Sequence, residues 1–146
     1  MAAWTSFDLF KQNQLKGATK LDFDDGNFYI AFTASDVVTN RATWDFFNDI
    51  TEITGGEVAA WGFNLAAADV DVSSNAARFI DATTVISFVA NVSNPTTAKY
   101  AVLYHKSGTD ATASRLVAYA VLNAGSTVDM RDGYTLTTTS GVYFSW

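Results

Sequence analysis

The sequence predicts an all-β fold: a single antiparallel β-sandwich domain, jelly-roll or immunoglobulin-like, with about eight to ten strands and a short N-terminal helix. Short β-favouring runs separated by turn residues are the first reason for this prediction. The second is composition, because 49% of the 146 residues are apolar and include eleven Phe, six Tyr and four Trp. Such a chain can bury one sizeable core. It has no linker and no fixed-period repeat, so residues 1–146 are expected to form one domain.

The strongest local pattern lies at residues 100–122. Residues 100–104 and 116–122 are nearly unbroken β-favouring apolar runs, which is typical of strands buried on both faces. A helix is the alternative, but Tyr and Val are poor helix formers. The polar connector 107–113 is rich in turn residues, so the two runs are predicted to form a central hairpin.

The N-terminal segment, residues 1–17, carries three aromatic residues near helical spacing: Trp4, Phe7 and Phe10. Ser6 can cap a helix and Gly17 can end one, which predicts a short helix from Phe7 to Leu15. A helix this short needs a docking partner. Its aromatic face is expected to pack on the sheet or on another subunit.

Further elements follow in order along the chain. Residues 21–23 and 28–32 are predicted to form a hairpin around Asp25-Gly26, and residues 36–41 a polar loop. Residues 43–50 are predicted to form one or two helical turns capped by Thr43. Gly55-Gly56 breaks the chain before a predicted strand at 57–65, and Asn94-Pro95 forms a later loop. The remaining strands are predicted at 69–72, 78–81, 84–92, 134–136 and 142–146.

Charge and composition exclude several kinds of partner, location and metal site. The net charge is -6 and the Lys and Arg residues are scattered, which argues against a nucleic-acid surface. No apolar run approaches the roughly 20 residues needed to cross a bilayer. The N-terminus lacks the basic and apolar regions of a secretory signal. With no cysteine, a disulfide framework and a thiolate zinc site are excluded.

No catalytic or cofactor motif is present in the sequence, so we expect neither an enzyme nor a cofactor or metal. The only histidine, His105, lies within a predicted strand and is interpreted as structural. Acidic residues around Gly26 suggest calcium, but the glycine stands at the wrong position for a calcium loop. Asp45, Asp49 and Glu52 could serve as paired carboxylates of a glycosidase, or as the polar face of a helical turn. Asn91-Val92-Ser93 matches a glycosylation sequon.

Four tryptophans in a short chain raise the hypothesis of a carbohydrate-binding module, since aromatic faces stack on sugars. They stand at positions 4, 44, 61 and 146, not on one strand at alternating spacing. Core packing and protein contacts explain this distribution at least as well.

Several segments together resemble a family of small structural proteins of tailed bacteriophages. They are residues 45–56, 77–82, 100–112 with 116–119, 133–136 and 140–142, together with the N-terminal helix, Leu15-Lys16-Gly17 and Leu21-Asp22. The resemblance covers nearly the whole chain. The family tends to have a histidine at the position of Trp44, and Asn-Glu-Val is more usual at 51–53.

The resemblance implies a non-catalytic virion protein, most specifically a capsid decoration (cement) protein. Its partner would be the major capsid protein of a phage head, bound on the outer capsid surface, and the chain would be made in the host bacterial cytoplasm. A homo-oligomer is expected, since several linked contacts raise effective concentration. The alternatives are a tail- or head-tail-associated component and a carbohydrate-binding module. We expect the interface at the aromatics of the N-terminus and of the loop around Trp44: Trp4, Phe7, Phe10, Trp44 and Phe47.

Overall fold

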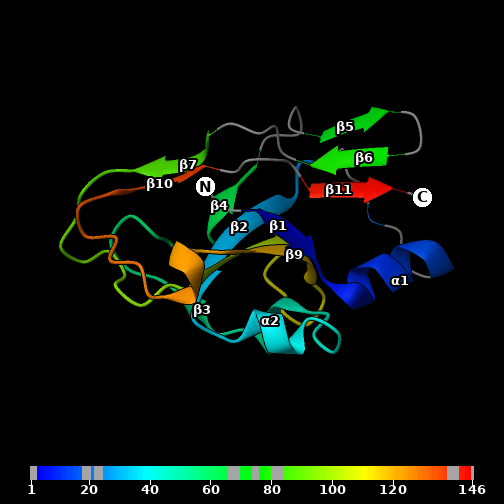
Figure 1. The fold of residues 1–146 in the computed structure, drawn as a ribbon, viewed down its shortest axis with the longest axis horizontal. Coiled ribbons are helices and arrows are strands. Elements are labelled where there is room, and N and C mark those ends of the chain that lie inside the picture. The colour runs from blue at the N-terminus through cyan, green and yellow to red at the C-terminus, as the bar shows by residue number, and fades with distance from the viewer. Residues whose placement is uncertain are drawn as a thin grey trace.

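The computed structural model describes residues 3–17, 21, 25–65, 70–73, 76–79, 84–137 and 142–145. In these ranges the chain is mostly β, with antiparallel sheets and a few short helices (Figure 1). This confirms the β-rich class and the short N-terminal helix.

The main sheet has six strands: β1 (Trp4–Ser6), β9 (Arg115–Val121), β8 (Tyr100–His105), β2 (Phe28–Thr33), β3 (Glu52–Ile53) and β4 (Phe63–Asn64). Its order is β1-β9-β8-β2-β3, and β4 also pairs with β2. The predicted central hairpin is confirmed, because β8 and β9 pair antiparallel with Val102 opposite Tyr119. Almost every residue of both strands is buried, as expected for continuous apolar runs.

Two smaller sheets accompany the main one. β7 (Thr84–Phe88) pairs with β10 (Tyr134–Thr137), and β6 (Ala76–Phe79) lies between β5 (Val70–Ser73) and β11 (Val142–Ser145). Aromatic rings join the β7–β10 pair to the main sheet, since Phe32 of β2 makes edge contacts with Phe88 and Tyr134 at centroid distances of 6.3 and 6.0 Å. Figure 1 shows β11 beside the β1 edge of the main sheet.

The N-terminal helix is α1 (Asp8–Lys16), close to its predicted bounds. Its N-cap is Phe7 rather than Ser6, because Ser6 is the last residue of β1 and pairs with Ala118. Gly17 ends the helix in the left-handed conformation (φ 69°) that glycine adopts without strain.

The predicted polar loop at 36–41 is wrong in part, because it contains the short helix α2 (Val37–Asn40). The Asp36 carboxylate caps it by accepting from the Thr39 backbone N–H at 3.1 Å. The predicted helical turns at 43–50 reduce to a 3-10 helix, η1 (Phe47–Asp49). Thr43 does not cap η1; its hydroxyl donates to the Asn40 carbonyl.

The strand predicted at 57–65 is also wrong, apart from the two residues of β4. Trp61 and Gly62 take positive φ values of 70° and 67°, which reverse the chain. A Cβ on Gly62 would lie 2.0 Å from the Ile30 carbonyl oxygen, so only glycine fits this approach to β2. Residues 22–24 lie outside the described residues; they include the acidic residues at 22 and 24 and the rest of the predicted 21–23 strand, since Leu21 itself is described and belongs to no strand. Trp146 and residues 138–141 also lie outside the described residues.

The core is built on the central strands and closed by the N-terminal segment. Phe7 is fully buried and makes an edge contact with Tyr119 of β9 at 5.4 Å. Its N–H donates to the Val117 carbonyl, which extends the β1–β9 pairing into the helix start. Among the described helices, none is long and apolar enough to span a membrane.

Candidate functional site

The five aromatic residues expected at an interface divide into two groups. Phe7, Phe10 and Phe47 are at most 6% exposed and belong to the core, so they are not available for contact, and that part of the prediction is wrong. Phe7 and Phe10 are buried because the N-terminal segment docks on the chain's own sheet, and Phe47 is buried because its ring stacks on Tyr104 of that sheet at 4.2 Å. Trp4 and Trp44 are half-buried and pack against the same core. The buried indole N–H of Trp4 has no hydrogen-bond partner among the described residues.

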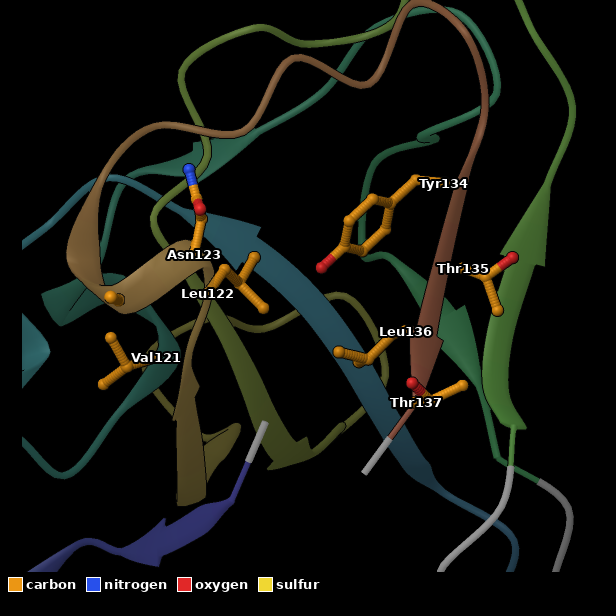
Figure 2. A pocket seen from close by; sticks show the side chains of 8 residues that line it. Val121, Leu122, Asn123, Tyr134, Thr135, Leu136 and Thr137 are labelled. Atoms are coloured by element: carbon orange, nitrogen blue, oxygen red, sulfur yellow. The ribbon is translucent and has the colours of Figure 1, made fainter. Parts of the chain in front are cut away.

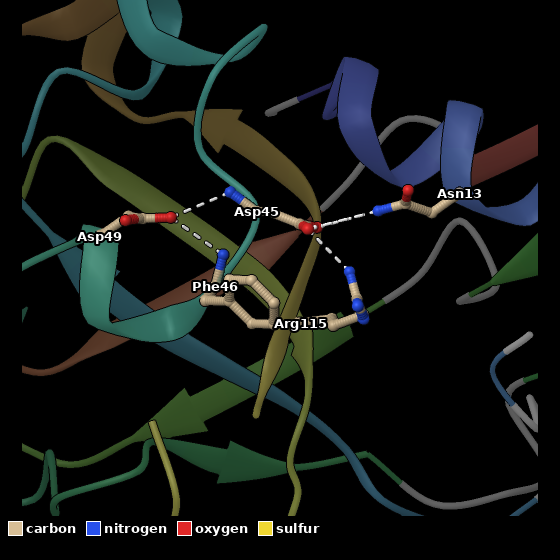
Figure 3. A network of polar contacts seen from close by, with 5 residues as sticks. All are labelled: Asn13, Asp45, Phe46, Asp49 and Arg115. Atoms are coloured by element: carbon tan, nitrogen blue, oxygen red, sulfur yellow. Dashed lines mark hydrogen bonds and ion pairs between the residues drawn. The ribbon is translucent and has the colours of Figure 1, made fainter. Parts of the chain in front are cut away.

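The carboxylates considered for glycosidic chemistry are engaged in structural bonds (Figure 3). Asp45 lies 2.7 Å from an Arg115 guanidinium nitrogen of β9, and the Asn13 amide of α1 donates to both of its oxygens at 3.3 Å. This network joins three segments that are far apart in the sequence. The Arg115 guanidinium also lies over the Phe46 ring, 4.7 Å from its centroid.

Asp49 has a different role from Asp45. Its Oδ2 accepts the backbone N–H groups of Asp45 and Phe46 at 2.9 and 3.0 Å, so it caps η1 from within. The Asp49 carboxylate is thus directed at backbone N–H groups, whereas the Asp45 carboxylate is directed at Arg115 and Asn13. The arrangement therefore fixes the loop to α1 and β9 and leaves no acid and base facing a shared substrate position.

The third acid, Glu52, lies on β3 in a different environment. One carboxylate oxygen is buried, with no hydrogen-bond partner in the part of the chain that the structure describes. Burial raises the pKa of Glu52, and the nearby N–H groups of Trp61 and Gly62 and the charge of Lys106 oppose that rise only in part. The Lys106 ammonium lies over the Tyr29 ring at 4.7 Å and the Trp61 ring at 5.3 Å.

Trp61 is held from several sides beside this acid. Its ring stacks on Phe47 at 5.4 Å, and its carbonyl accepts the Tyr104 hydroxyl at 2.7 Å. Burial raises the pKa of Tyr104, which is consistent with a permanently protonated donor. The strained backbone of Trp61 is thus explained by packing and hydrogen bonding, without a ligand.

His105 pairs with Asp25, with Nε2 and Oδ2 2.7 Å apart. Partial burial alone would raise the pKa of Asp25, but hydrogen bonds from His105 and Asn27 outweigh it and lower the pKa. The His105 ring also makes an edge contact with Phe28 at 5.0 Å. No cluster of three His, Cys, Asp or Glu side chains suited to a metal occurs within the described ranges.

A cavity of about 220 Å³ lies between the end of β9, the 3-10 turn η3 (Asn123–Gly125) and β10 (Figure 2). Figure 2 shows the Tyr134 hydroxyl directed toward Leu122, whereas the Thr135 side chain turns toward β7 and its hydroxyl meets Ser87 at 3.1 Å. The lining residues include no carboxylate, histidine or lysine. The cavity therefore offers apolar, hydroxyl and amide contacts but no carboxylate, imidazole or amine for proton transfer.

Sequence reasoning did not find the Asp45–Arg115 pair or the burial of Glu52. The two members of the pair are 70 residues apart, and no local pattern marks them as partners. The burial of Glu52 depends on the reversal at Trp61, which lies nine positions later in the sequence. The chain matches no protein-family model, no curated protein and no solved structure.

Proposed function

We propose that the chain is a structural protein of a tailed-phage virion, most specifically a capsid decoration protein that binds the outer surface of the head. The resemblance in the sequence suggests this class. The state of the tryptophans is the structural observation that supports it best. Trp4, Trp44 and Trp61 are half-buried and pack against the core, which is what an assembly protein needs and a sugar-stacking platform does not.

The engaged carboxylates support a non-catalytic role. Asp45 is bound by Arg115 and Asn13, and Asp49 caps η1, so neither retains the free, facing geometry of a glycosidase pair. The acidic net charge of -6 favours protein partners over nucleic acid.

The proposal includes a sandwich architecture and a homo-oligomer. The contacts of Phe32 with Phe88 and Tyr134 support a face-to-face packing of the β7–β10 pair on the main sheet. A jelly-roll or immunoglobulin-like arrangement is the form proposed. Copies at symmetry-related positions would each need only a modest contact with the major capsid protein.

The experiment adds purified protein to expanded heads of the encoding phage that lack it. We expect saturable, symmetry-matched binding and greater resistance of the heads to heat and osmotic shock. Binding only to purified tails would move the protein to the tail or the head-tail junction. Recognition of sugars on a glycan array without any binding to heads would favour the carbohydrate-binding alternative.

A further inference from the structure

Three loops meet at one end of the molecule, and one buried side chain forms hydrogen bonds with all of them. The loops are residues 54–58, 89–95 and 128–133, and the side chain is Asn94, which is 3% exposed. Its Oδ1 accepts the Glu57 N–H at 2.8 Å, and its Nδ2 donates to the carbonyls of Val89 and Met130 at 3.1 and 3.0 Å. All three loops are therefore held at one point.

We call residues 54–58, 89–95 and 128–133 together the Asn94 loop end. Further hydrogen bonds and close packing restrict its movement. The Asn91 N–H donates to the Arg131 carbonyl at 2.9 Å, and the Asn91 side chain accepts from the Ser93 N–H at 2.9 Å. Gly56 lies so close to the Asn94 side chain that a Cβ on Gly56 would be 2.3 Å from Asn94 Oδ1. A loop fixed in this way loses little conformational entropy when it binds a partner.

The same loop presents apolar side chains to solvent. Val89 is 69% exposed and Val92 is 89% exposed, and they stand three positions apart. Single exposed apolar residues are ordinary on protein surfaces. Two of them on a rigid loop that nothing in the described fold covers form a preorganised contact point.

The charges around the valines favour one kind of occupant. Two of the three loops carry exposed acids: Glu57 in one, and Asp129 and Asp132 in the other. Arg131 is the only cation in these described segments, and it is already paired with Asp129. A second copy meeting this end would bring like charges together, which is unfavourable. A protein surface with a shallow apolar recess and a basic rim complements it.

We propose that the Asn94 loop end is the face that docks on the phage head, with Val89 and Val92 inserting into an apolar recess that has a lysine- and arginine-rich rim. This inference rests on the proposed function and names its contact surface. Copies of the chain would meet one another through other faces.

The test measures co-sedimentation of purified variants with heads of the encoding phage that lack this protein. We expect the double variant Val89→Ser/Val92→Ser to bind at least tenfold more weakly than the unmodified protein. The matched control is Leu15→Ser, because Leu15 is 80% exposed on α1, which lies at the opposite end of the molecule in Figure 1. It should bind normally, and all variants should melt at the temperature of the unmodified protein.

A second variant tests the charge complementarity. Asp132→Lys should weaken binding and reduce its dependence on salt concentration, since one attraction to the basic rim becomes a repulsion. Sedimentation velocity without heads should show the same oligomer for the unmodified protein and for the double valine variant.

The possible results separate the two proposals. If the unmodified protein binds heads and the double valine variant binds equally well, or if Leu15→Ser loses as much binding, the assignment of this face is wrong and the decoration function stands. An oligomer that dissociates in the valine variant would also overturn the assignment, because the valines would then join copies. Absence of binding by the unmodified protein would overturn both proposals.

Discussion

Asn94 provides the sharpest test of how the loops are held together, because one side chain makes three hydrogen bonds from a buried position. Replacing it by alanine removes both the acceptor of the Glu57 N–H and the donor to two carbonyls. Each net hydrogen bond is worth about 1 kcal/mol, so Asn94→Ala should destabilise the fold by about 3 kcal/mol. For a chain of this size that loss lowers the melting temperature by roughly 10 °C.

The aspartate variant separates hydrogen bonding from packing. Asn94→Asp keeps the acceptor for the Glu57 N–H but directs a second oxygen at the carbonyls of Val89 and Met130. At neutral pH it should therefore be less stable than Asn94→Ala. Below about pH 4 the introduced carboxyl group becomes protonated and can donate one bond again, so the difference should shrink.

The assay is chemical denaturation followed by tryptophan fluorescence, repeated at pH 7 and pH 4. Asn91→Ala is the matched comparison, because Asn91 stands on the same loop but its amide donates to Glu57 Oε1 at an exposed position, 3.1 Å away. It should cost about 1 kcal/mol or less. An Asn94→Ala protein within about 1 kcal/mol of the unmodified chain would refute the view that this residue holds the three loops.

Three further predictions test individual contacts. Glu52→Gln should raise the free energy of unfolding at pH 7 by about 1 kcal/mol. The pKa of Glu52 is raised in the folded state, so its contribution to stability is present below the ordinary pKa of a glutamate and is lost as the pH rises. Melting curves of the variant and the unmodified protein should therefore differ at pH 7 and converge at pH 4. Phe7→Ala should cost about 3–5 kcal/mol in a denaturant titration, because the ring is fully buried, whereas exposed Leu15→Ala should not. His105→Gln should leave head binding unchanged but shift acid unfolding, followed by circular dichroism, to higher pH. The hydrogen bond from His105 helps to lower the pKa of Asp25, and a lowered pKa gives stability that is lost as the pH falls.

The central hairpin was predictable because its information is local. Residues 100–104 and 116–122 favour strands by residue type, and their lack of alternation matches burial on both faces. The helix α1 was predictable for the same reason, from aromatic spacing and a terminal glycine. The local sequence did not indicate which surface would cover the aromatic face of α1. That depended on β1 pairing with β9, more than a hundred positions away in the sequence.

The failed predictions share a physical cause, since tertiary contacts decided the local conformation. Residues 57–65 have strand-like composition, but Gly62 meets the Ile30 carbonyl and Trp61 binds the Tyr104 hydroxyl, so the chain turns there. Asn94 precedes a proline and was correctly placed in a loop, yet its burial comes from loops at 54–58 and 128–133. The strand or turn propensity of a residue type does not include such tertiary contacts.

The size of the Asn94 loop end constrains how a decoration protein could use it. Burying a valine completely is worth about 1.5–3 kcal/mol, so Val89 and Val92 together supply about 3–6 kcal/mol. Association of two free molecules costs roughly 4–15 kcal/mol, so one copy meeting one isolated capsid subunit should bind weakly through these side chains. Linked copies on an assembled head share that cost, and avidity rises by orders of magnitude without a new contact. We therefore expect tight retention on intact heads and fast exchange on dissociated subunits, measured by dilution and surface plasmon resonance. Equal affinity for both would contradict a small, multiply repeated contact.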